Sequence, residues 1–182
     1  MHEVKLGFKI KDYLTGKEID ATTYEDIRQD IVKTLVEDKS YPMEQIKSKV
    51  PIIFKIDQKE FGRNIDFVIF LENKPLVIIL FSAGEIETYI REAVSLSRLI
   101  EGGPARFSIV TDTKKFILVC AKDGEVISQG PYKNFPTWQG ILNLLDRCPE
   151  FTLDDIRLEK EKRILYALSQ LSCECRDSCL SK

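Results

Sequence analysis

Residues 62–82 read GRNIDFVIFLENKPLVIILFS. Two β-rich runs, 65–71 and 76–82, are separated by four polar or turn-forming residues, a pattern typical of a β-hairpin. The second run is apolar throughout, which predicts a strand buried on both faces of a mixed or parallel sheet covered by helices. Asp66 is the exception, because a buried carboxylate costs several kcal/mol unless it is paired, hydrogen-bonded or metal-bound. We therefore take Asp66 as the centre of a candidate site.

Composition and charge restrict the possible partners. The chain has 182 residues, of which 43% are hydrophobic, enough for one sizeable core. Its 27 basic and 29 acidic residues give a net charge of -2, so no global field attracts nucleic acid or an anionic membrane. Binding to DNA needs a local basic group, and the best one comprises Lys47, Lys49, Lys55, Lys59 and Arg63. We predict Lys55, Lys59 and Arg63 as nucleic-acid-binding residues, with solvated surface charge as the alternative interpretation.

Apolar runs and cysteines indicate the compartment. No run approaches the roughly 20 apolar residues that span a bilayer, and the first residues lack the apolar region of a signal peptide, so we expect a cytoplasmic protein. An odd number of cysteines, five, favours reduced thiols over a disulfide framework. Cys173, Cys175 and Cys179 crowd the end of the chain. A closed zinc site needs four ligands, so a reduced tail without metal is the favoured interpretation.

The segments before the hairpin predict a strand and a helix. Alternating apolar residues over 4–10 are typical of a half-exposed edge strand. Thr22 and Glu25 then have the spacing of a capping box, and a helical apolar face follows at 27–35. Glu25 either only caps this helix or also points into a site. We further expect a short helix within 42–50, a strand over 51–56 and a loop over 57–62.

The segments after the hairpin predict a crossover. A helix over 85–100 ends at Gly102-Gly103-Pro104, and a strand follows over 107–111. Strand, helix and strand at this spacing make the strands 76–82 and 107–111 parallel. Two more strands and a C-terminal helix complete the chain. The fold class is therefore α/β (α+β), with a mixed central sheet flanked by helices in residues 1–150 and a helical extension with a cysteine-rich tail in 151–182.

This order of elements resembles the restriction-endonuclease-like, or PD-(D/E)xK, nuclease core. More narrowly, it is similar to the N-terminal domain of the R subunit of type I restriction enzymes and to related small stand-alone proteins. The resemblance covers roughly residues 10–129. It rests on five motifs in this order: Asp12-Tyr13-Leu14-Thr15-Gly16-Lys17, Tyr24-Glu25-Asp26-Ile27-Arg28-Gln29, Gly62-Arg63-x-x-Asp66, Lys74-Pro75-Leu76-Val77-Ile78-Ile79 and Phe107-Ser108-Ile109-Val110-Thr111-Asp112.

The resemblance implies a defined set of catalytic groups. Two carboxylates of the hairpin hold Mg²⁺, a helix glutamate supports the metal, and a lysine two residues after the second carboxylate acts on the attacking water. Glu25 matches the helix acid and Asp66 the first strand acid. Leu80 and Ser82 occupy the positions of the second acid and the lysine, and neither can do that work. We therefore predict a vestigial site with no cofactor, in which Arg63 or backbone N–H groups meet the charge of Asp66.

Three functions remain at this point. The leading prediction is a degenerate nuclease-fold module that binds DNA weakly, or a protein partner or a second copy, without membrane association. The rival is an active Mg²⁺-dependent endonuclease whose catalytic groups have moved to the helix 85–100, and the third is a purely structural protein. The charged residues of that helix are otherwise surface charges paired at i,i+4, and they comprise Glu85, Glu87, Arg91 and Glu92.

Overall fold

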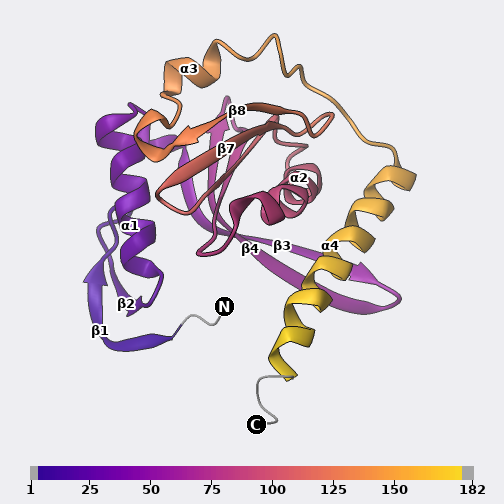
Figure 1. Ribbon diagram of the computed structural model, residues 1–182, viewed down its shortest axis with the longest axis horizontal. Coiled ribbons are helices and arrows are strands. Elements are labelled where there is room, and N and C mark those ends of the chain that lie inside the picture. The colour runs from indigo at the N-terminus through magenta and orange to yellow at the C-terminus, as the bar shows by residue number, and fades with distance from the viewer. Residues whose placement is uncertain (1–3, 178–182) are drawn as a thin grey trace.

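A six-stranded mixed sheet forms the centre of the protein (Figure 1). The computed structural model describes residues 4–177, and the side chains of residues 4–169. The strand order in the sheet is β3-β4-β5-β6-β7-β8. The bounds are β3 Ile46–Ile56, β4 Lys59–Leu71, β5 Lys74–Phe81, β6 Phe107–Thr111, β7 Lys115–Cys120 and β8 Val126–Pro131. This mixed sheet with flanking helices confirms the predicted fold class.

Helices lie on both faces of the sheet, so each face has its own apolar core. Helix α1 (Glu25–Lys33), its continuation η1 (Thr34–Asp38) and α3 (Trp138–Leu142) pack on one face. Helix α2 (Ile90–Leu99), preceded by η3 (Ile86–Tyr89), packs on the other. The long α4 (Asp155–Asp177) then packs against α2 and β3. The remaining helical turns are η2 (Met43–Gln45) and η4 (Tyr132–Asn134).

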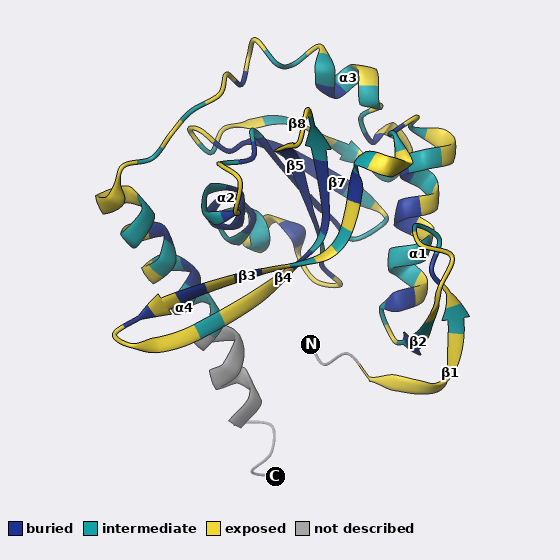
Figure 2. Ribbon diagram, turned by 180° about the vertical axis from the view of Figure 1, so that it is seen from behind, coloured by how far each residue is buried: buried dark blue, intermediate teal, exposed yellow. Residues whose placement is uncertain are grey.

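Strand β5 is the buried central strand that its composition predicts. Six consecutive residues of β5, 75–80, are buried, and Figure 2 shows this part of the sheet as the darkest region of the molecule. Strand β5 pairs antiparallel with β4 and parallel with β6, which confirms both the hairpin and the crossover. Gly102 and Gly103 end the crossover helix segment with φ of 93° and 108°, a conformation that favours glycine.

The arm formed by β3 and β4 is longer than the sequence indicates. Residues 46–50 belong to β3, so the expected helix over 42–50 is wrong apart from the single turn η2. The expected loop over 57–62 is also wrong, because β4 begins at Lys59 and the turn consists of Asp57 and Gln58 alone. Both turn residues have positive φ, 47° and 67°, as a two-residue hairpin turn requires. Long-range pairing has outweighed a weak local pattern.

The N-terminal strand β1 (Lys5–Lys11) does not join the central sheet. It pairs only with β2 (Glu18–Thr22) in a separate two-stranded sheet beside α1. The alternating residues Val4, Leu6 and Phe8 are exposed, and Figure 2 shows β1 as an exposed strand. The predicted strand is therefore present, but its apolar residues do not cover the main core.

Two of the five cysteines form a disulfide. Cys120 of β7 and Cys148, which follows α3, are bonded and buried, so the expectation of reduced thiols is wrong for this pair. Their sequence separation of 28 residues hides the pairing, because only the tertiary fold brings β7 against the segment after α3. The side chains of Cys173, Cys175 and Cys179 lie outside the described residues. Within the described chain, no helix is both long and apolar enough to cross a membrane.

Candidate functional site

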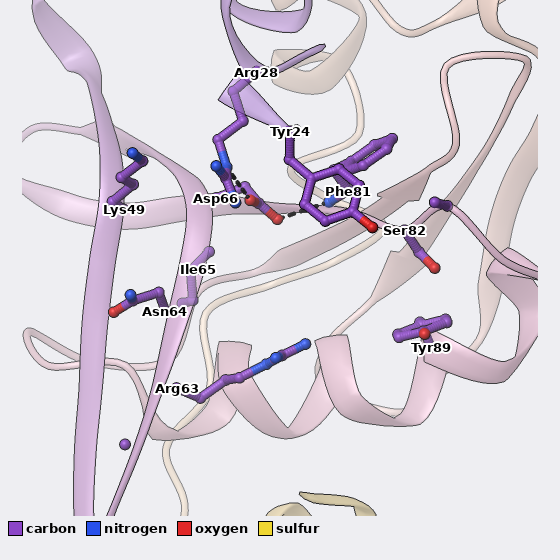
Figure 3. Close-up of a pocket in the computed structure, with 12 residues that line it drawn as sticks. Tyr24, Arg28, Lys49, Arg63, Asn64, Ile65, Asp66, Phe81, Ser82 and Tyr89 are labelled. Carbon is purple, nitrogen blue, oxygen red and sulfur yellow. Dashed lines mark hydrogen bonds and ion pairs between the residues drawn. The ribbon is translucent and has the colours of Figure 1, made fainter. Parts of the chain in front are cut away.

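A cavity of about 530 Å³ opens where α1, the arm β3–β4 and the end of β5 meet (Figure 3). Asp66 lies in its wall, so the residue singled out from the sequence does mark a concave site. Polar side chains from three elements surround it, namely Arg28, Lys49, Arg63 and Asn64. The aromatic residues Tyr24, Phe81 and Tyr89 complete most of the wall.

The carboxylate of Asp66 is fully engaged by the protein. Arg28 Nε lies 2.7 Å from Asp66 Oδ1, and the backbone N–H of Phe81 donates to Oδ2 at 2.9 Å. The dashed lines of Figure 3 mark these two bonds. Charge-assisted hydrogen bonds of this kind compensate the burial of a carboxylate whose side chain is only 14% exposed. A backbone N–H group was expected here. The expected Arg63 instead binds Glu92, with Nε 2.6 Å from Oε1.

Glu25 lies behind the cavity wall and points toward the site. Its side chain is 2% exposed, and Oε2 lies 2.5 Å from Lys49 Nζ and 3.3 Å from Arg28 Nη1. Gln29 Nε2 donates to Oε1 at 3.0 Å. The predicted capping box is wrong: the N-cap of α1 is Tyr24, which makes no side-chain cap hydrogen bond, although Thr22 Oγ1 accepts the backbone N–H of Glu25 at 3.1 Å. The side chain of Glu25 therefore does not serve only as a cap: it contacts Arg28 and Lys49 of the cavity wall, although Glu25 itself does not line the cavity.

A second buried acid, Asp12, is connected to Glu25 through the side chain of Gln29. Gln29 Nε2 also donates to Asp12 Oδ1 at 3.1 Å, so one amide connects Asp12 with Glu25. Burial by itself raises the pKa of Asp12, but hydrogen bonds from Thr15 and Gln29, together with the charge of Lys49, outweigh it and hold the pKa below its ordinary value. Asp12 therefore stays ionised and fixes Gln29 in the orientation that donates to Glu25.

Leu80 and Ser82 flank Phe81, whose backbone N–H binds Asp66, but neither supplies a ligand. The register of β4 and β5 ends at Phe67 and Ile79, one residue before Asp66 and Leu80. Leu80 is 3% exposed and belongs to the core under α2. Ser82 is buried in the cavity wall, where its Oγ accepts the backbone N–H of Gly84 at 3.2 Å.

The donor set does not fit Mg²⁺, which prefers an octahedron of oxygen ligands. Asp66 and Glu25 share one guanidinium, that of Arg28, and Lys49 neutralises Glu25 further. Across residues 4–169, no group of three or more acidic, histidine or cysteine side chains could hold a metal ion. The side chains of Arg28 and Lys49 already provide the positive charge that these carboxylates need.

The predicted basic group does not form one surface. Lys55 lies opposite Glu60 in the β3–β4 register. Lys59 lies opposite Ile56 and Arg63 opposite Ile52, so both alternate with Glu60 along β4. Successive residues of a strand point to opposite faces, so Lys55 faces away from Lys59 and Arg63. Of the three, only Arg63 lines the cavity. Nucleic-acid binding by Lys55 and Lys59 stays a prediction.

The charged residues of 85–100 bind elsewhere. Glu85 and Glu87 contact Lys115, and Arg91 contacts Glu161. Glu92 does not line the cavity, but it forms an ion pair with Arg63, which does. Among the described residues that line the cavity, none is one of these four.

The chain matches the model of a known protein family. A family model described as the type I restriction enzyme R protein N terminus matches residues 23–136. The chain belongs to this family. The match spans α1 through β8 and includes every residue of the cavity wall, whereas Asp12 precedes it. Searches of curated proteins and of solved structures gave no match.

Sequence reasoning missed the roles of Arg28 and Lys49 in this type I R-protein N terminus, although Arg28 stood in a family motif and Lys49 in the basic group. The spacing of Glu25 and Arg28, i and i+3 on one helix, is a usable signal, because such residues are neighbours on the helix surface. Lys49 gave a misleading signal, since it stood in a segment assigned to a helix. Tyr24 stood in a family motif without an assigned role and Tyr89 carried no signal, because ring contacts with a cavity depend on the tertiary fold.

Proposed function

We propose that this domain is a catalytically degenerate member of the restriction-endonuclease-like, PD-(D/E)xK, superfamily that binds nucleic acid without cleaving it. The single observation that carries the proposal is the position of Arg28. Its guanidinium contacts both Asp66 and Glu25, the two acids that the nuclease resemblance assigns to the metal. An organic cation held there replaces the charge of a metal, but it activates no water.

The other catalytic roles support the same proposal. In the nuclease pattern, the position of Leu80 carries the second carboxylate and that of Ser82 carries the lysine. Leucine has no oxygen for a hard cation, and serine has no positive charge. Loss of a group that orients the nucleophile or stabilises the developing charge typically lowers the rate by orders of magnitude. Two catalytic roles have no suitable residue, and the carboxylates of Asp66 and Glu25 are already paired with Arg28. The function that we propose for the cavity is therefore binding, without hydrolysis.

The rival function, an endonuclease with displaced catalytic residues, has little support from the geometry. Such an enzyme needs a carboxylate or lysine of α2 or η3 beside Asp66. Glu85 and Glu87 bind Lys115 instead, and Glu92 binds Arg63. Their carboxylates already serve ion pairs.

Cleavage assays test the proposal directly. Purified protein is incubated with plasmid and with single-stranded DNA in Mg²⁺ or Mn²⁺, and we expect no product above that of a matched Asp66→Ala preparation. Cleavage by the unaltered protein that disappears in Asp66→Ala, after contaminating nucleases are excluded, overturns the proposal in favour of the displaced site.

A gain-of-function variant tests the physical reason for the deficit. Leu80→Glu with Ser82→Lys restores the two absent roles, and Arg28→Leu releases Asp66 from its internal cation. We expect the triple variant to bind Mn²⁺ measurably in a calorimetric titration, whereas Leu80→Glu with Ser82→Lys alone binds it far more weakly. The matched control Leu80→Gln with Ser82→Lys and Arg28→Leu lacks the new charge. Equal Mn²⁺ affinity of the double and triple variants would falsify the role given to Arg28.

A further inference from the structure

The cavity presents cations outward and keeps its acids covered. Lys49 and Arg63 have side chains that are 44% and 49% exposed, whereas their partners Glu25 and Glu92 are 2% and 14% exposed. An ammonium carries three N–H donors and a guanidinium five, so one contact each leaves donors that face the cavity. Asn64 also lines the cavity, beside Lys49 in Figure 3. A ligand entering the cavity therefore meets hydrogen-bond donors with positive charge, although the ion pairs beneath are balanced.

The opposite side of the cavity is aromatic. Tyr24 and Phe81 have ring centroids 5.7 Å apart, and Tyr89 of η3 lines the wall further along. Figure 3 shows Tyr24 and Tyr89 across the cavity from Lys49 and Asn64. Aromatic rings stack with nucleobases of any sequence, while cationic donors bind the phosphate. The two walls thus match the two chemically different ends of a nucleotide.

The size of the cavity sets how much nucleic acid it admits. Its volume of about 530 Å³ lies within the range of sites for small ligands, about 300–1,000 Å³. A paired base inside a duplex cannot reach such a cavity without leaving the stack, and extruding it costs energy. An unpaired base in a single strand or at a frayed end enters without that cost.

We infer that the cavity binds one unpaired nucleotide of a single-stranded nucleic acid, with its phosphate at Lys49 and Arg63 and its base against Tyr24 and Tyr89. The inference rests on the proposed function and adds to it the kind of strand that is recognised. Arg28 keeps Asp66 and Glu25 neutralised, so that no exposed carboxylate repels the phosphate. The internal ion pair thereby converts a metal-type site into an anion site.

Fluorescence polarisation with labelled oligonucleotides tests the inference. We expect a single-stranded oligonucleotide to bind at least tenfold more tightly than a blunt duplex of the same sequence. Tyr89→Leu should weaken single-strand binding at least fivefold, whereas Tyr89→Phe retains it because the ring remains. Lys49→Gln and Arg63→Gln should each weaken binding and reduce its salt dependence. Lys122→Gln, a charge removed at an exposed position outside the cavity, is the matched control and should change nothing.

The outcomes separate the inference from the proposed function. Equal affinity for duplex and single strand, with Tyr89→Leu unaffected, overturns the nucleotide site and leaves a binding module that uses another surface. Single-strand binding that survives Lys49→Gln combined with Arg63→Gln also overturns it. Absence of binding to any nucleic acid overturns both, and directs the search to a protein partner. Thermal unfolding of each variant shows whether a loss of affinity reflects a loss of fold.

Discussion

Arg28 is the residue on which the site depends, since it is the shared counterion of Asp66 and Glu25. Its side chain is 12% exposed and those of its partners are 14% and 2% exposed, so little solvent replaces it. Removing one partner of a buried ion pair leaves an uncompensated charge and typically costs about 3–5 kcal/mol. We therefore expect Arg28→Met to lower the free energy of unfolding by about 3 kcal/mol, measured by urea denaturation at neutral pH.

The control for Arg28→Met is Lys5→Met, which breaks an ion pair with Asp20 at the surface. The side chains of Lys5 and Asp20 are 77% and 51% exposed, so solvent takes over their interaction. We expect no measurable change in unfolding. An Arg28→Met protein as stable as the parent would mean that solvent or another cation compensates the acids, contrary to the internal-cation role.

At the scale of elements, a buried acid of α4 binds α2 beside the apolar contacts of Leu165. Glu161 accepts hydrogen bonds from Arg98 Nη1 at 2.6 Å, Arg91 Nη2 at 2.8 Å and Ser95 Oγ at 2.9 Å. Burial by itself raises the pKa of Glu161, but these three donors outweigh it and hold the pKa below its ordinary value. The α2–α4 contact is therefore formed with an ionised carboxylate.

This lowered pKa gives the contact a pH dependence of defined sign. The unfolded-state pKa of a glutamate is about 4.3, so Glu161 contributes its stability above that pH and loses it as the pH falls through the lower folded-state pKa. We expect Glu161→Gln to lose about 2 kcal/mol at pH 7 and distinctly less at about pH 3. Urea denaturation of parent and variant at both pH values measures the difference. A deficit of the same size at both pH values contradicts an ionic contact.

At the scale of the whole molecule, the net charge is -2, so the protein as a whole does not attract nucleic acid and any binding has to come from local contacts. We expect nucleic-acid binding to be weak, insensitive to sequence and steeply reduced by salt, because phosphate contacts carry no base information. Arg63→Glu should weaken it more than Lys55→Glu, since only Arg63 lines the cavity. Affinities measured at several salt concentrations for the three proteins check this. Binding that ignores salt would show that another surface is used.

Local pattern was sufficient for the architecture around β5. The apolar run of β5, the glycines after α2 and the spacing to β6 predicted the hairpin and the parallel crossover, because each depends on residues close together in the chain. The same approach failed over 42–62. There, a β3–β4 arm forms because two strands pair along their whole length, and short local signals do not report such pairing.

The sequence by itself determined the mixed α/β fold and the family, and it fixes Leu80 and Ser82 as residues that have neither a carboxylate nor a positive charge. It also marked Asp66 and Glu25. Only the tertiary structure decided that Asp66 contacts Arg28, 38 residues away, and that Glu25 contacts Lys49 of β3. The physical reason is that a buried charge is compensated by whichever partner the fold brings within about 3 Å. Partners distant in the chain become neighbours only when α1 packs against the sheet.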